Sequence, residues 1–255
     1  MLLHTALIIK RAYKMLINHE LYAKRWEKES DLMESKGVYE WLASLTPEGN
    51  VLEFGCGAGQ STRYLLNHHS VLSLENNEYL INSAKENLVK HGCASAIHQC
   101  DFFTLSESDK QLISDFAPKV IVGWLIGGSG VDQLKQVPTV QNPAEMSKKY
   151  REKIEDIIAS PEVCIDSVEY IQLASRGHGI AGADKNDVFI ATKADYDQFV
   201  FNPVGFEVIT VESMSWAHEE STFTYGHAHN PNFAGGKKVE TVPLVTSILA
   251  KRISK

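Results

Sequence analysis

Residues 51–62, VLEFGCGAGQST, combine an acidic side chain with three glycines that are spaced two residues apart. Glu53 stands at the end of an apolar, strand-like run, and Gly55, Gly57 and Gly59 follow it. Glycines at the end of a strand let the backbone adopt positive φ and let a ligand approach the main chain closely. The helix predicted to follow would offer free N–H groups in its first turn. This pattern predicts a ligand over the turn, and a tight turn without a ligand is the alternative.

The spacing of the glycines argues against a nucleotide phosphate. The dinucleotide fingerprint G-x-G-x-x-G would need Gly or Ala at position 60, where the chain has Gln60. A P-loop is excluded as well, because no Gly-Lys-Ser/Thr follows. Glu53 would repel a pyrophosphate, whereas its charge suits a ligand that carries an ammonium or another cationic group. The turn therefore favours a cationic cofactor.

The run from Glu53 to Gly59, EFGCGAG, resembles the first motif of the class I S-adenosylmethionine-dependent methyltransferases, Asp/Glu-x-Gly-x-Gly-x-Gly. S-adenosylmethionine has an ammonium group and a sulfonium but no phosphate. The resemblance covers about residues 48 to 255 and implies that Glu53, Gly55, Gly57 and Gly59 bind this cofactor.

Two further strand ends follow the plan of this family. Glu75 ends the second predicted strand, where the resemblance implies an acid that accepts hydrogen bonds from the ribose hydroxyls, a task that suits a carboxylate. Asp101 ends the third, where family members often place an acid near the adenine amino group, and Phe102 is available to pack on the ring. Ordinary loop acids are the alternative for both carboxylates.

The elements that must position these residues alternate along the chain. Strand-like runs occupy 50–54, 70–75, 95–100, 119–126, 167–175, 205–212 and 243–251, and helical patterns occupy 59–67, 78–91, 107–115, 144–159 and 192–200. Such alternation predicts an α/β fold with a doubly wound, seven-stranded, mostly parallel sheet. The long connection before the last strand predicts that this strand runs antiparallel. Residues 1–47 are expected to form a helical cap and residues 48–255 the cofactor-binding domain.

Composition limits the partners. The 255 residues are 44% hydrophobic and carry a formal charge of −7, which argues against a broad nucleic-acid surface. The fourth strand lacks the Asn/Asp/Ser-Pro-Pro-aromatic tetrapeptide that is usual in the amino-methylating nucleic-acid enzymes of this fold. The four cysteines form no close CxxC pair and favour reduced thiols in a cytoplasmic protein. The apolar N-terminal run is too short to span a bilayer, and we expect no membrane partner.

The residues that would receive the methyl group or move a proton are less well defined. His178 and His227 are candidate general bases. His218, His227 and His229 could hold a metal, although we expect none because no cysteine accompanies them. The loops 127–143 and 215–241 exceed typical connections and are candidate acceptor contacts, together with the strand-four residue Trp124. The aromatic residues of the second loop either line a pocket or pack it onto the sheet: Trp216, Phe223, Tyr225 and Phe233.

The sequence therefore predicts a methyltransferase that acts on an unidentified small molecule. An aminopropyl-type transferase with the same fold is one alternative. A binding or assembly protein that keeps the fold without chemistry is another, because no residue is unambiguously catalytic.

Overall fold

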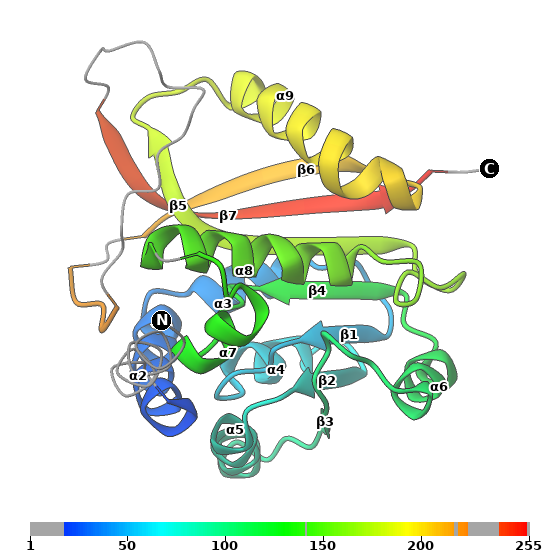
Figure 1. Ribbon diagram of the computed structural model, residues 1–255. Coiled ribbons are helices and arrows are strands. Elements are labelled where there is room, and N and C mark those ends of the chain that lie inside the picture. The colour runs from blue at the N-terminus through cyan, green and yellow to red at the C-terminus, as the bar shows by residue number, and fades with distance from the viewer. Residues whose placement is uncertain (1–17, 141, 217–218, 224–239, 254–255) are drawn as a thin grey trace, which may run out of the picture.

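A computed structural model of the chain describes residues 18–140, 142–216, 219–223 and 240–253, and within them seven strands form one sheet (Figure 1). The strands lie in the order β3-β2-β1-β4-β5-β7-β6. In chain order they are β1 (Val51–Phe54), β2 (Val71–Glu75), β3 (Ala96–Gln99), β4 (Val120–Trp124), β5 (Tyr170–Ile180), β6 (Phe206–Ser215) and β7 (Thr241–Arg252).

The last strand is the one that runs against its neighbours. β1 pairs in parallel with β2 and β4, and the same direction continues to β3 and β5. β7 lies between β5 and β6 and pairs antiparallel with both. The prediction of a seven-stranded, mostly parallel sheet with an antiparallel last strand is confirmed.

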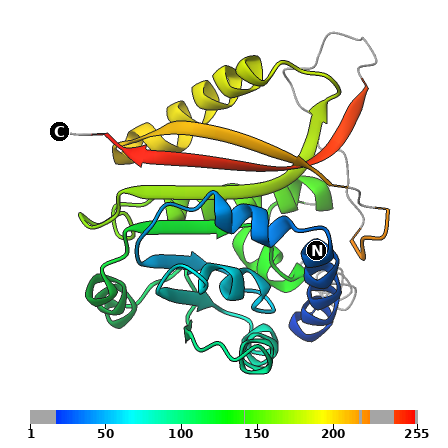
Figure 2. The same cartoon turned by 180° about the vertical axis from the view of Figure 1, so that it is seen from behind.

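Each face of the sheet has its own hydrophobic core, because alternate side chains of a strand point to opposite faces. In β1, Leu52 and Phe54 belong to one buried cluster and Val51 belongs to the other. In β4, Ile121 joins the first cluster and Val122 the second. Helices cover both clusters: α8 lies on the face that is in front in Figure 1, and α3 lies on the opposite face, which Figure 2 brings to the front. The sheet is therefore doubly wound.

Six of the eight described α-helices begin at residues whose side chains cap them. Asn18, Asn77, Ser106, Ser129, Asn142 and Asp184 each accept a hydrogen bond from the first turn that follows. The helices are α2 (His19–Ser35), α3 (Val38–Ser44), α4 (Gln60–Leu65), α5 (Glu78–Lys90), α6 (Glu107–Phe116), α7 (Gly130–Gln136), α8 (Pro143–Ile158) and α9 (Lys185–Tyr196), and a π-helical turn (Asp197–Phe201) with a 3-10 turn (Asn202–Val204) continues α9.

The N-terminal helices share a core with the sheet. Trp26 of α2 and Leu42 of α3 lie in the same buried cluster as Val51 and Val122. Gln60, the residue that breaks the dinucleotide register, donates a hydrogen bond from Nε2 to Asp31 Oδ1 of α2 at 2.9 Å. α2 is thereby held beside the glycine turn. The domain boundary at residue 47 stays a prediction.

The segment 127–143, which we expected to be a loop, contains α7. Ser129 accepts a hydrogen bond from the Asp132 backbone, and the Asp132 carboxylate accepts one from the Ser129 backbone, which together form a capping box. The four-residue pattern Ser-x-x-Asp carried this signal in the sequence. α7 has no fully buried residue, so the sequence shows no apolar periodicity that would predict a helix there.

Two further boundaries differ from the prediction. β5 continues to Ile180, five residues beyond its predicted end, because β7 pairs with it over this whole length. α9 begins at Lys185, since Asp184 caps it there, and not at residue 192. Among the described helices, none has both the length and the apolar character needed to cross a bilayer.

Candidate functional site

The glycine turn lies at the carboxyl end of β1. Gly57 has φ of 52° and Gly59 has φ of 88°, a region that residues with a side chain rarely adopt. A Cβ atom at Gly57 would lie 2.4 Å from Trp26 Nε1, and one at Gly59 would lie 3.0 Å from Ala84 Cα. Both positions therefore need glycine, Gly57 because α2 lies over it and Gly59 because α5 packs against it.

Glu53 is buried beneath the turn and not in its opening. Its carboxylate accepts hydrogen bonds from Ser61 Oγ at 2.5 Å, Thr62 Oγ1 at 2.6 Å and Ser73 Oγ at 2.7 Å. Burial raises the pKa of the Glu53 carboxyl, and these three hydroxyls act in the opposite direction. The geometry gives Glu53 a positioning role, because it ties β1 to α4 and β2. Its predicted contact with the cofactor stays a prediction.

Glu75 lies at the end of β2 and faces the turn. One carboxylate oxygen accepts a hydrogen bond from the Gly57 backbone N–H at 3.2 Å, and the other accepts from the N–H groups of Asn76 and Asn77, both at 3.0 Å. Burial raises the pKa of Glu75 to about 7, and the nearby Asp132 carboxylate acts in the same direction. Glu75 lines a small cavity of about 30 Å³ between the ends of β1, β2 and β4.

Asp101 and Phe102 follow β3 but differ in their surroundings. Phe102 is buried, lines the small cavity and packs edge-on against Phe54, with ring centroids 5.6 Å apart. Asp101 accepts a hydrogen bond from Lys135 Nζ of α7 at 2.7 Å and is not among the residues that line this cavity. The structure therefore brings Phe102 together with Gly55, Gly57 and Glu75. The adenine contact of Asp101 stays a prediction.

Two aromatic side chains of α2 cover the small cavity. Tyr22 and Trp26 line it, and their rings stack on each other with centroids 6.2 Å apart. Phe223 packs edge-on against both rings. The cavity holds little more than one water molecule in this arrangement. A ligand can reach Gly57 only if the Trp26 indole moves away from it.

Several lining residues were missed by the sequence reasoning. These are Asn76, Asn77 and Asp132, which supply polar groups. Trp124, which we expected among the acceptor contacts, lies at the end of β4, is buried, and has an indole Nε1 that lacks a hydrogen-bond partner in the described residues. A buried donor without a partner is costly, so it favours a ligand acceptor at this place. The Ser-x-x-Asp pattern of the capping box could have drawn attention to Asp132. Nothing in the sequence indicates that the Trp124 indole N–H is buried without a hydrogen-bond partner.

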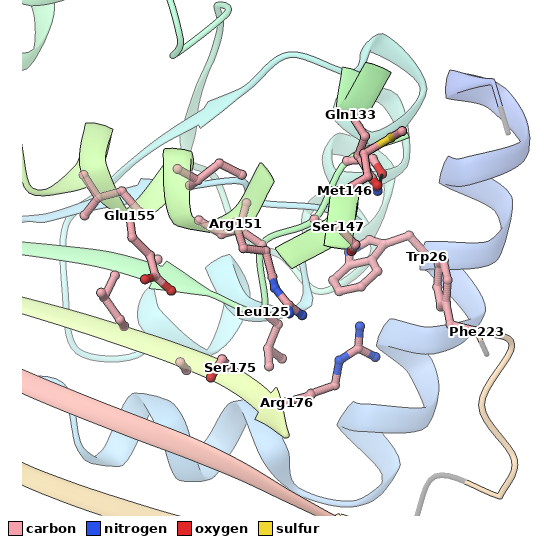
Figure 3. A pocket seen from close by; sticks show the side chains of 18 of the residues that line it. Trp26, Leu125, Gln133, Met146, Ser147, Arg151, Glu155, Ser175, Arg176 and Phe223 are labelled. Carbon is pink, nitrogen blue, oxygen red and sulfur yellow. Dashed lines mark hydrogen bonds between the residues drawn. The ribbon is translucent and has the colours of Figure 1, made fainter. Parts of the chain in front are cut away.

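A much larger cavity, of about 700 Å³, adjoins the small one (Figure 3). Its walls come from α8, the ends of β4 and β5, α2 and the segment that contains Phe223. The two cavities share six lining residues, namely Tyr22, Trp26, Leu125, Ile126, Gly127 and Gly128. Gly127 and Gly128, at the start of the 127–143 segment that we expected to contact the acceptor, thus line both cavities.

Of the two candidate general bases, His178 falls within the described residues. His178 lies on the exposed part of β5 opposite Pro243 of β7, and it is not among the lining residues of either cavity. His218, His227 and His229 lie outside the described residues, as do Tyr225 and Phe233. Phe223 does line the large cavity, while Trp216 is buried in the core on the α2 side of the sheet.

One group of side chains in the described part of the chain has the spacing of metal ligands. His98, Cys100 and Asp109 offer ligand atoms within 4.8 Å of one another. His98 Nε2 lies 2.6 Å from Asp109 Oδ1, and the same carboxylate caps α6 through Ser106. Burial raises the pKa of the Cys100 thiol to about 12, so the thiolate that a metal needs is disfavoured. The hydrogen bonds explain this group without an ion.

No protein-family model and no curated protein matches the sequence. Solved structures resemble it at low identity. A candidate RNA methyltransferase from Pyrococcus horikoshii is 13% identical, with a TM-score of 0.46 over 87% of this chain and 85% of its own. Precorrin-6y C5,15-methyltransferase from Geobacter metallireducens GS-15 is 15% identical, with a TM-score of 0.43 over 84% and 86%. Magnesium protoporphyrin IX methyltransferase from Synechocystis PCC 6803, crystallised with bound SAM, is 11% identical, with a TM-score of 0.41 over 91% and 84%.

All three neighbours are named as methyltransferases. Identities and TM-scores of this size carry no argument about what this chain does. The names also point to different acceptors, RNA in one case and precorrin or protoporphyrin in the others. The function must therefore be argued from the site.

Proposed function

We propose that the protein binds S-adenosylmethionine at the carboxyl ends of β1 and β2 and transfers its methyl group to a small molecule held in the large cavity. The observation that carries the proposal is the junction of the two cavities. Gly57 and Glu75 line the small one, and six residues are shared with the large one. A donor over Gly57 would therefore meet an acceptor at this junction.

The residues present fit the cofactor in type and place. Gly57 has no side chain to block a ligand once the Trp26 indole has moved, Glu75 offers carboxylate oxygens for ribose hydroxyls, and Phe102 offers an aromatic ring. The unpartnered Nε1 of Trp124 adds a donor. Glu53, Gly59 and Asp101 complete the proposed cofactor set, Glu53 and Gly59 by holding the turn and Asp101 through its predicted contact with the adenine amino group.

The chain's own contribution to the reaction is positioning and the exclusion of water. S-adenosylmethionine, when bound, supplies an electrophilic methyl group on its sulfonium. Transfer is an in-line displacement, and fixed orientation of the two reactants can supply most of the acceleration. The largely apolar walls of the large cavity hold the acceptor and exclude competing water. Where the acceptor carries a proton, Glu155 of the cavity wall can accept it, because burial raises the pKa of this carboxyl to about 7.

The size of the acceptor cavity favours a small molecule over nucleic acid. The large cavity has the volume of typical small-molecule sites, and the formal charge of −7 opposes phosphate backbones. Labelled S-adenosylmethionine should be incubated with a metabolite extract and, separately, with total RNA. We expect labelled product and S-adenosylhomocysteine only with the extract, and product only with RNA would contradict the small-molecule assignment.

Binding alone is tested by calorimetry with S-adenosylmethionine, S-adenosylhomocysteine and decarboxylated S-adenosylmethionine. We expect the first two to bind in the micromolar range. Preference for the decarboxylated form would indicate an aminopropyl-type transferase instead. Binding without S-adenosylhomocysteine release in any extract would indicate a binding protein.

A further inference from the structure

The polar side chains of the large cavity are few and lie in a regular pattern. α8 turns Met146, Tyr150, Ile154 and Ile158 toward the core. Ser147, Arg151 and Glu155, which are also spaced by four residues, form an adjacent polar stripe along the cavity wall. Residues three or four apart lie on the same side of a helix. The part of the cavity wall that α8 forms is therefore apolar except for this one line of polar side chains.

Two guanidinium groups face the same part of this cavity. Figure 3 shows Arg151 of α8 and Arg176 of β5 directed toward each other beside Leu125 and Trp26. This part of the cavity is also the junction with the cofactor site, because Trp26 and Leu125 line both cavities. Two like charges that converge on one space repel each other, and an anion between them would offset this repulsion.

Arg176 is fixed in place by the protein. Its Nη1 lies 2.5 Å from Glu29 Oε1, and its guanidinium lies 5.4 Å from the centre of the Trp26 ring. The Glu29 side chain is fully buried and also accepts hydrogen bonds from Ser221 Oγ at 2.8 Å and from the Thr222 N–H at 3.1 Å. Arg176 therefore has a counterion and a rigid orientation.

Arg151 lacks such a counterion. Among the residues that the structure describes, no carboxylate lies within ion-pair distance of its guanidinium, although thirteen such pairs occur elsewhere in them. Glu155, one turn along α8, is the acid on the stripe. Burial raises its pKa to about 7 and outweighs the opposite effect of the Arg151 charge, so part of Glu155 is neutral near pH 7. Because Glu29 offsets the charge of Arg176, Arg151 is the cation that, in the described part of the chain, remains available to a ligand at the cavity junction.

We propose that the acceptor is an amphipathic small molecule whose apolar body fills the large cavity and whose carboxylate lies between Arg151 and Arg176. This inference rests on the proposed function, since it names the acceptor class for that site. A planar guanidinium pairs with a carboxylate through two parallel hydrogen bonds, which also fixes the orientation of the ligand. The anion would lie beside Trp26, close to the methyl donor. The acceptor atom is therefore the carboxylate itself or a group next to it.

The test uses octanoate, octanol and octylamine as probes, titrated by calorimetry into the full chain with saturating S-adenosylhomocysteine. We expect octanoate to bind most tightly. Arg151→Gln should weaken octanoate by roughly 10- to 100-fold, the range for a hydrogen bond to a charged group, and leave octanol unchanged. Lys148→Gln is the matched control, because it removes one positive charge from the same helix outside the cavity. Arg176→Gln is unsuitable, because it would leave Glu29 buried and without its counterion.

The outcomes separate this inference from the proposed function. Equal binding of the three probes, tightest binding of octylamine, or equal weakening by both variants would overturn the carboxylate assignment, while bound S-adenosylhomocysteine would leave the proposed function standing. Absence of S-adenosylhomocysteine binding by the wild-type chain would instead overturn the proposed function, and with it the claim that a bound carboxylate is a methyl acceptor.

Discussion

The two cavities are built in different ways. In the small one, Gly55, Gly57 and Glu75 lie close together in the chain, at or just after the ends of β1 and β2, and residues of α2, β4 and α7 complete the lining. The large one collects α2, α8, β4, β5 and Phe223, which are far apart in the sequence. A cofactor site can therefore be recognised from local spacing, whereas an acceptor site depends on how distant elements are packed. The variants below test whether the two regions act separately.

Gly57→Ala should have the largest effect, confined to the cofactor region. The new Cβ atom meets Trp26 Nε1 at 2.4 Å, and the φ of 52° adds strain. In the complex, where Trp26 has moved, the same Cβ atom would press on the ligand. Overpacking of this kind costs about 1–3 kcal/mol, so we expect S-adenosylhomocysteine affinity to fall by roughly 5- to 150-fold in calorimetry. Gly92→Ala is the matched control, because its φ of 69° carries the same strain and no atom lies within 4 Å of the new group. Similar loss of affinity in both variants would contradict the assignment.

Glu53→Ala should reduce stability by about 2–4 kcal/mol in urea unfolding, because unpaired buried hydroxyls and a new cavity both cost free energy. The three hydroxyls of Ser61, Thr62 and Ser73 would lose their acceptor. Glu86→Ala, on the exposed side of α5, is the control and should change stability by less than about 0.5 kcal/mol. If Glu53→Ala were as stable as this control, the positioning role would be wrong.

Glu75→Ala should weaken S-adenosylhomocysteine binding by roughly 10-fold or more, because hydrogen bonds to a charged acceptor contribute about 1.5–3 kcal/mol. Octanoate binding to the α8 wall should change little, since Glu75 does not line the large cavity. Calorimetry with both ligands measures the two effects in one sample. If Glu75→Ala strongly weakened octanoate binding and left cofactor affinity unchanged, the proposed separation of the cofactor site from the acceptor cavity would be wrong.

Glu155→Gln should have the smallest effect on cofactor affinity and should act on the pH dependence of stability. The pKa of Glu155 is raised from 4.5 to about 7 in the folded chain. The unfolded chain releases this proton first as the pH rises, so the group's contribution to stability is lost between pH 4.5 and about 7 and is constant above that range. The melting temperature of the variant relative to wild type should therefore increase across this window. A difference that does not depend on pH would contradict the shifted pKa.

Much of the fold could be predicted because strands and helices alternate with clear periodicity. The seven strands lie close to their predicted ranges, and the final pair is antiparallel as expected. α7 was missed because its only signal is the capping box of Ser129 and Asp132. The extension of β5 to Ile180 was missed because it depends on pairing with β7, more than sixty residues later.

The residues of the site also divide into those that local sequence patterns reveal and those that only packing brings together. Gly57 and Glu75 were found because they belong to a motif and to a strand end. Arg151 was missed because one arginine on an amphipathic helix looks like ordinary surface charge, and only the packing of α8 beside β5 brings it to Arg176. The predicted reduced state of the cysteines is consistent with the four unpaired thiols, and the cytoplasmic location stays a prediction.

The most direct test of the account is a crystal structure of the protein with S-adenosylhomocysteine. We expect ligand density over Gly57, with the ribose hydroxyls within hydrogen-bond distance of the Glu75 carboxylate. The Trp26 indole should be displaced toward the large cavity. Ligand bound elsewhere, or an undisturbed Trp26 at millimolar S-adenosylhomocysteine, would contradict it.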